Sequence, residues 1–103
     1  ALETEGLLRL ERERLAADLE AARVRVESSR TQLAAAEKRA QLARESRGFF
    51  DKSSRLGESD LPTRLRIELE AVEAERQNAR TRIELAAAIS ALRQAMGLLP
   101  EQK

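Results

Sequence analysis

The chain has 103 residues, of which 36% are charged and 2% are aromatic, and its 19 basic residues nearly balance its 18 acidic ones. This length allows one domain at most. The balanced charge and the scarcity of aromatic rings argue against a nucleic-acid-binding protein, because such proteins present a basic surface and often stack bases on aromatic side chains.

The composition also argues against an enzyme. The sequence contains no Cys and no His, so it lacks thiolates, the commonest metal ligand and the usual general base. Ala, Glu, Leu and Arg dominate, which is typical of long helices and coiled coils. We therefore predict a protein without catalytic activity, cofactor or metal. No apolar run is long enough to span a bilayer as a helix.

A first long helix is predicted at about residues 5–53, since neither Gly nor Pro occurs between Leu7 and Arg47. Alternating steps of four and three residues select a mostly apolar row, as in a heptad seam. This row is Leu8, Arg12, Leu15, Leu19, Ala22, Val26, Ser29, Leu33, Ala36, Ala40, Ala43, Arg47 and Phe50. A second, weaker row indicates either another neighbour or simply the abundance of Ala; it is Leu10, Ala17, Ala21, Val24, Ala35, Leu42 and Phe49.

A turn is predicted at about residues 54–60. Gly57 can adopt the left-handed conformation that ends a helix. Ser59 or Asp60 can cap the next helix by accepting a backbone N–H bond. Pro62 would lie in the first turn of that helix, where its missing N–H costs nothing.

A second helix is predicted at about residues 61–97, ended by Gly97 and Pro100. The same spacing rule selects Leu65, Leu69, Val72, Arg76, Ala79, Ile83, Ala86 and Ser90 as its buried row. Near the end of the helix, the apolar face shifts to Leu85, Ile89, Leu92, Met96 and Leu99.

Two long helices joined by a short turn pack as antiparallel neighbours. We therefore predict an all-α fold, an antiparallel two-helix coiled-coil hairpin that comprises residues 1–103 as one unit. Facing residues should have numbers that sum to roughly 115. The expected facing pairs are Ala43 with Val72, Leu33 with Ile83, and Leu19 with Met96.

Two short stretches resemble a known family. Leu56-Gly57-Glu58-Ser59 forms the turn, and Leu92-Arg93-Gln94-Ala95-Met96-Gly97 ends the second helix. This pattern resembles that of the outer-membrane efflux proteins of the TolC-like family. In that family a long helix ends in an aliphatic-Gly-polar turn, and the shorter helix that follows ends in a Leu-x-x-Ala-x-Gly type sequence.

The resemblance implies a function in transport. Such proteins are trimers with a barrel in the outer membrane and a periplasmic tunnel built from helical hairpins, whose tips bind a periplasmic adaptor (membrane-fusion) protein. This chain would be one periplasmic hairpin of a larger protein. Its partner-binding tip would consist of Arg55, Leu56, Gly57, Glu58 and Ser59.

Two other interpretations remain open. A hairpin of the adaptor protein itself also has a polar tip, with an Arg, a Leu and a Ser across the turn. Arg55, Leu56 and Ser59 supply these residue types, although at tighter spacing. The third interpretation is a general coiled-coil scaffold or dimerisation segment.

The chain alone should also self-associate. Leu7, Leu8, Leu10 and Leu15 form the densest aliphatic cluster of the first helix, and the register leaves them without a partner in the second helix. A second copy in a two-fold antiparallel arrangement would cover them. The competing outcome is fraying of the first turns, because Gly6 weakens the helix there.

Overall fold

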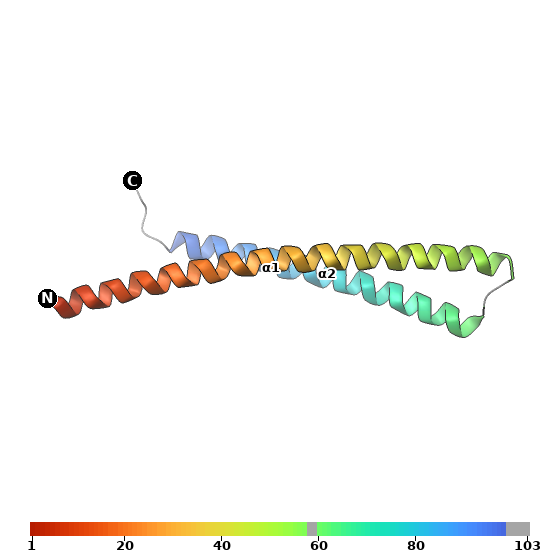
Figure 1. Ribbon diagram of the computed structural model, residues 1–103, viewed down its shortest axis with the longest axis horizontal. Coiled ribbons are helices and arrows are strands. Elements are labelled where there is room, and N and C mark those ends of the chain that lie inside the picture. The colour runs from red at the N-terminus through yellow and green to blue at the C-terminus, as the bar shows by residue number, and fades with distance from the viewer. Residues whose placement is uncertain (58–59, 99–103) are drawn as a thin grey trace. The chain divides into compact units, whose positions relative to one another are not determined.

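The computed structural model describes residues 1–57 and 60–98, and two helices contain nearly all of them (Figure 1). Helix α1 is Leu2–Arg55 and helix α2 is Leu61–Gly97, and the described residues contain no strand. The contacts divide into two compact units. Unit 1 comprises residues 1–30 and the described residues from 84 onward, and unit 2 comprises residues 31–83. The predicted all-α hairpin is confirmed.

The helix boundaries lie close to those predicted from Gly, Pro and capping residues. Helix α2 has the predicted bounds, whereas α1 begins three residues earlier and ends two residues later than predicted. Gly6 and Gly48 lie inside α1 and a Cβ at either position would meet open space. The helix therefore tolerates both glycines at a cost of about 1 kcal/mol each relative to Ala.

The part of α1 in unit 2 is buried along the predicted row. Ala36 and Ala40 are buried, and Ala40 is 0% exposed. The half-buried members of the row are Leu33, Ala43, Arg47 and Phe50. The heptad spacing read from α1 therefore selected the correct face of the helix.

The buried row of α2 in unit 2 differs from the prediction. The residues predicted to be buried there are exposed. We call them the outer row, which is Leu65, Leu69, Val72, Arg76, Ala79 and Ile83. The buried or half-buried residues form the inner row, which is Ile67, Ala71, Ala74, Asn78 and Thr81.

Spacing alone does not distinguish these rows, because both follow steps of four and three. They are offset by two residues, or about 200° around the helix axis. The outer row has the larger aliphatic side chains, but the inner row has Ala71 and Ala74. Small side chains allow the backbones of two helices to approach closely, as the full burial of Ala40 also indicates. Helix α2 therefore packs on α1 through the row with the small residues, and the larger aliphatic side chains of the outer row remain exposed.

Two ion pairs fix the alignment of the helices in unit 2. Arg82 binds Glu37 at 3.0 Å, and Arg44 binds Glu75. The residue numbers sum to 119 in both pairs, within about one helical turn of the predicted value. The predicted facing pairs Ala43–Val72 and Leu33–Ile83 were nevertheless wrong, because Val72 and Ile83 are exposed members of the outer row.

Unit 1 has a core with larger aliphatic side chains. Here α1 buries or half-buries the predicted row from Leu15 onward, namely Leu15, Leu19, Ala22, Val26 and Ser29. The first two members of the row, Leu8 and Arg12, are exposed. From α2, Leu85, Ile89 and Leu92 are half-buried as predicted, and Ala88 is buried. Ala86 and Ser90, which were predicted to be buried, are exposed. Met96 was expected to face Leu19, but it is exposed, and the half-buried neighbour in α2 is Ala95. Leu99 lies outside the described residues.

Candidate functional site: the turn and the outer row

The end of α1 forms the first half of the predicted tip. The Leu56 N–H donates to the Ser53 carbonyl at 3.1 Å, and the Gly57 N–H donates to the Ser54 carbonyl at 3.0 Å. Gly57 has a φ of 80°, which is the left-handed conformation predicted for it. A Cβ there would meet no neighbouring atom, so the backbone conformation alone selects glycine.

Asp60 begins the next helix as its N-cap. The Thr63 N–H donates to the Asp60 carboxylate at 2.7 Å, and the Arg64 N–H donates to the Asp60 carbonyl at 3.1 Å. Hydrogen bonds from the Thr63 side chain and backbone lower the pKa of the Asp60 carboxyl, and the charge of Arg66 acts in the same direction. Asp60, one of the two predicted capping candidates, makes the capping bond, and the other candidate, Ser59, lies outside the described residues. Pro62 lies in the first turn, as predicted.

The tip presents aliphatic side chains to solvent. Arg55 and Gly57 are exposed, and Leu56 is 76% exposed. The other two predicted tip residues, Glu58 and Ser59, lie outside the described residues. Sequence reasoning missed Leu61, which is also 76% exposed just after the cap. An aliphatic residue on each side of the turn is the signal that could have identified it.

The outer row of α2 provides a second apolar surface. Leu65, Leu69 and Val72 are each more than half exposed, and Ile83 is 71% exposed. Because α2 packs on α1 through its inner row, the outer row lies on the far side of α2. This surface was predicted to be buried within the hairpin, and it is instead available to another helix.

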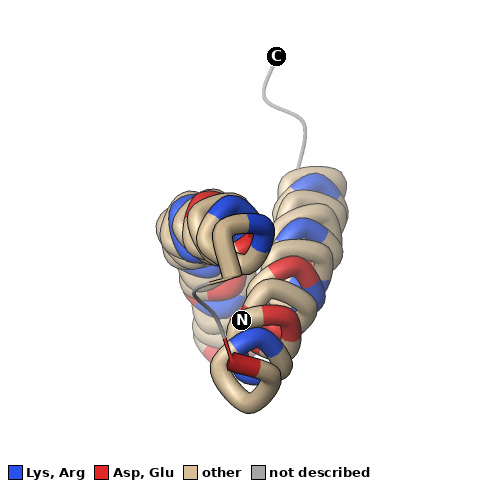
Figure 2. Tube along the Cα trace, turned by 90° about the vertical axis from the view of Figure 1, so that its right-hand side faces the viewer, with Lys and Arg blue, Asp and Glu red and all other residues tan. Residues whose placement is uncertain are grey.

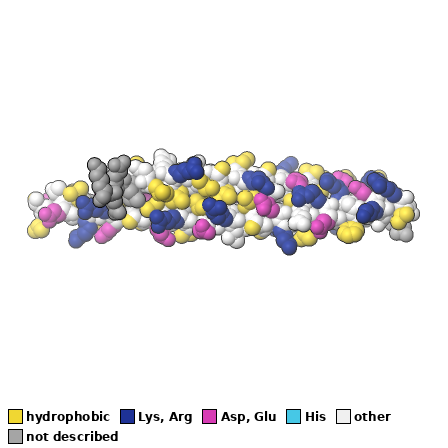
Figure 3. Space-filling view, turned by 90° about the horizontal axis from the view of Figure 1, so that it is seen from above, with side chains coloured by type: hydrophobic (Ala, Val, Ile, Leu, Met, Phe, Trp, Pro, Cys, Tyr) yellow, Lys and Arg dark blue, Asp and Glu magenta, His cyan; other side chains and the backbone are white. Residues whose placement is uncertain are grey.

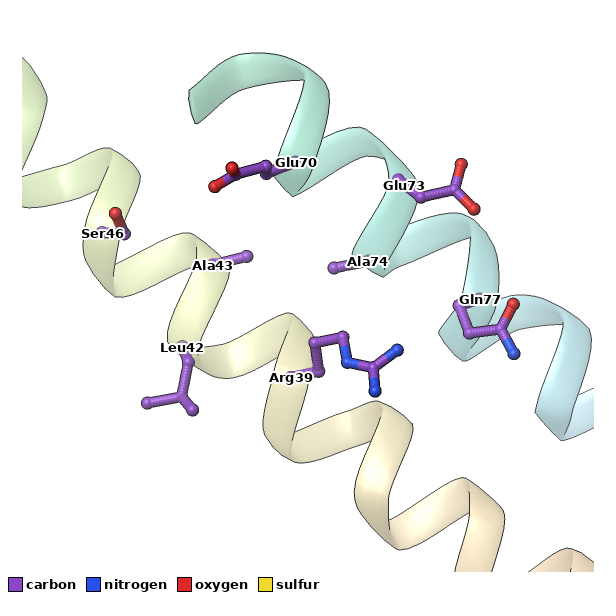
Figure 4. A pocket seen from close by; sticks show the side chains of 8 residues that line it. All are labelled: Arg39, Leu42, Ala43, Ser46, Glu70, Glu73, Ala74 and Gln77. Atoms are coloured by element: carbon purple, nitrogen blue, oxygen red, sulfur yellow. The ribbon is translucent and has the colours of Figure 1, made fainter. Parts of the chain in front are cut away.

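One flank of unit 2 is a groove with an apolar floor. It has a volume of about 480 Å³, with Leu42, Ala43 and Ser46 on the α1 side and Glu70 and Ala74 on the α2 side. Ala43 and Ala74 point toward each other across it, as Figure 4 shows. The exposed Leu42 belongs to the second apolar row predicted in α1.

The opposite flank of unit 2 is polar. It carries the Glu37–Arg82 and Arg44–Glu75 ion pairs, with Lys38 and Gln41 beside them. These side chains are about half exposed, so their pairing contributes little to stability. The Asn78 side-chain oxygen is buried nearby and accepts no hydrogen bond from the described residues.

Charges are distributed along both helices. Figure 2 shows basic and acidic residues interspersed on α1 and α2, and Figure 3 shows hydrophobic side chains between them on one face. Within residues 1–57 and 60–98, no group of three or more His, Cys, Asp or Glu side chains could hold a metal ion. Neither described helix is long and apolar enough to cross a membrane.

Comparisons with known proteins do not identify a family. No protein-family model, no curated protein and no solved structure matches this chain.

Proposed function

We propose that this chain is a segment of the periplasmic α-helical tunnel of a TolC-like outer-membrane efflux protein. In this proposal the full-length protein is a trimer anchored in the outer membrane. The tip of the hairpin binds a periplasmic adaptor protein. The proposal rests on the resemblance at Leu56-Gly57-Glu58-Ser59 and at the end of α2, and on the two exposed surfaces described above.

The outer row of α2 is the observation that carries the proposal. A helix in a wall of helices has a neighbour on each side and therefore needs an apolar row on each side. In unit 2, α2 packs on α1 through its inner row and exposes Leu65, Leu69 and Ile83 on the far side. A hairpin that functions alone gains nothing from these exposed aliphatics, because their burial is favourable and their exposure is not.

The tip supports the second part of the proposal. Leu56 and Leu61 are exposed beside Gly57, at the end of an otherwise charged hairpin. Exposed aliphatic residues next to a fixed turn provide a small apolar contact for another protein. Glycine leaves the surface of the turn low, so that a partner can approach the backbone closely.

The tip is tested in the full-length protein, expressed in a host that lacks its own outer-membrane efflux channel and supplied with the cognate adaptor. Gly57→Gln should abolish efflux while the trimer and its expression remain normal. Gly48→Gln is the matched control, because Gly48 lies inside α1 and a Cβ there meets open space. Normal efflux in the Gly57 variant would contradict a tip-docking role.

The tunnel wall is tested separately through the outer row. Leu69→Lys and Ile83→Lys should disrupt the trimer, because a charge replaces an aliphatic side chain at the contact with the neighbouring helix. Arg76→Lys, in the same row, should leave the trimer intact. If both Lys variants form normal trimers, the outer row does not face a tunnel neighbour. The coiled-coil scaffold would then be the better interpretation.

A further inference from the structure

The first turns of α1 carry a face that no described residue covers. Glu3, Leu7, Leu10 and Arg14 are spaced by four, three and four residues, so they line one side of the helix. Leu7 is 67% exposed and Leu10 is 60% exposed. The buried row of α1 in unit 1 uses a different side, which begins with the half-buried Leu15. We call these four residues the arm face.

The arm face is complementary to itself when its direction is reversed. Its order along the chain is acidic, aliphatic, aliphatic, basic. An antiparallel second copy, related by a two-fold axis between Leu8 and Arg9, places Glu3 opposite Arg14 and Leu7 opposite Leu10. A parallel copy would instead place Glu3 opposite Glu3 and Arg14 opposite Arg14, which like-charge repulsion disfavours.

The charges at both ends of the arm face are available for such a contact. Neither Glu3 nor Arg14 takes part in an ion pair within the part of the chain that the structure describes. In a dimer with a two-fold axis, Glu3 of each copy pairs with Arg14 of the other copy. The two equivalent ion pairs then lie on either side of four leucines. The ion pairs would fix the orientation of the copies, and burial of the leucines would drive their association.

We propose that two copies of this chain associate antiparallel through Glu3, Leu7, Leu10 and Arg14. The partner is a second copy of this chain. The proposal does not depend on a role in efflux, because it rests on the exposed leucines and the charge order of the arm face. It also gives specific contacts to the self-association expected from the leucine cluster.

Sedimentation equilibrium of the 103-residue chain over a range of concentrations tests the proposal. The unmodified chain should form a dimer. Arg14→Glu should weaken the dimer at least tenfold, because it places Glu3 opposite an acidic residue in both ion pairs. Arg12→Glu is the matched control, since it makes the same change in charge about 200° away around the helix and should have little effect.

A double variant then separates pairing from a general effect of charge. Glu3→Arg combined with Arg14→Glu restores opposite charges across the two-fold axis, and it should recover most of the lost affinity. An unmodified chain that stays monomeric at every concentration would overturn the proposal. So would equal weakening by Arg14→Glu and Arg12→Glu, or a double variant that associates no better than Arg14→Glu. Circular dichroism of each variant verifies that its helices are intact.

Discussion

Within unit 2, the two helices place their large aliphatic side chains differently. Helix α1 half-buries Leu33 in the row that faces α2. Helix α2 half-buries Ile67 and buries Ala71 and Ala74, but most of its large aliphatics, such as Leu65, Leu69 and Ile83, are exposed. The contact between the helices is therefore set by small side chains, which permit close approach. Large aliphatics on the far side of α2 remain available for contacts outside the hairpin.

The largest change in the free energy of unfolding is expected from overpacking at Ala40. This side chain is fully buried, so Ala40→Leu should force the helices apart and lower the free energy of unfolding by ~1–3 kcal/mol. The same substitution at the exposed Ala79 of the outer row should change it by no more than ~0.5 kcal/mol. Urea unfolding followed by circular dichroism measures both values. Equal effects would mean that the close contact is not at Ala40.

A smaller effect is expected when a large side chain is truncated. Leu33→Ala should lower the free energy of unfolding by ~1–2 kcal/mol, below the range for fully buried leucines, because Leu33 is only half-buried. Leu69→Ala in the outer row should cost ~0.5 kcal/mol or less. The same unfolding experiment compares the two, at a protein concentration low enough to keep the chain monomeric. A larger loss for Leu69 would place the outer row inside the folded hairpin.

The smallest effect concerns the start of α2 and depends on pH. The pKa of Asp60 is lower in the folded chain than its ordinary value, so ionised Asp60 stabilises the fold. This contribution is complete above the unfolded pKa of about 4 and is lost as the pH falls through the lowered folded value. Melting temperatures should therefore fall more on acidification for the unmodified chain than for Asp60→Asn, which keeps a neutral cap. Identical pH dependences would contradict this role.

The fold could be predicted from the sequence, because each boundary rests on local chemistry. Gly57 ends α1 through its left-handed backbone, and Asp60 caps α2 through its carboxylate. The buried row of α1 was also predictable, since it combines heptad spacing with residues such as Val26 and Leu33. These signals require no knowledge of the partner helix.

The buried row of α2 could not be predicted in the same way. Both of its rows follow the same spacing, and the choice depends on how closely α1 approaches. That distance depends on small residues of both helices, such as Ala43 and Ala74, which point toward each other (Figure 4), and periodicity along one helix does not contain this relation.

The two ion pairs of unit 2 also restrict sliding of one helix along the other. Glu37 and Arg44 lie one heptad apart on α1, and Glu75 and Arg82 lie one heptad apart on α2. A slip of one heptad preserves the apolar pattern, but it places Arg44 opposite Arg82 in one direction and Glu37 opposite Glu75 in the other. Each misaligned hairpin would thus lose both ion pairs and place two like charges opposite each other. Half-exposed charges that add little stability can in this way exclude the misaligned hairpins that a repetitive, alanine-rich contact would otherwise permit.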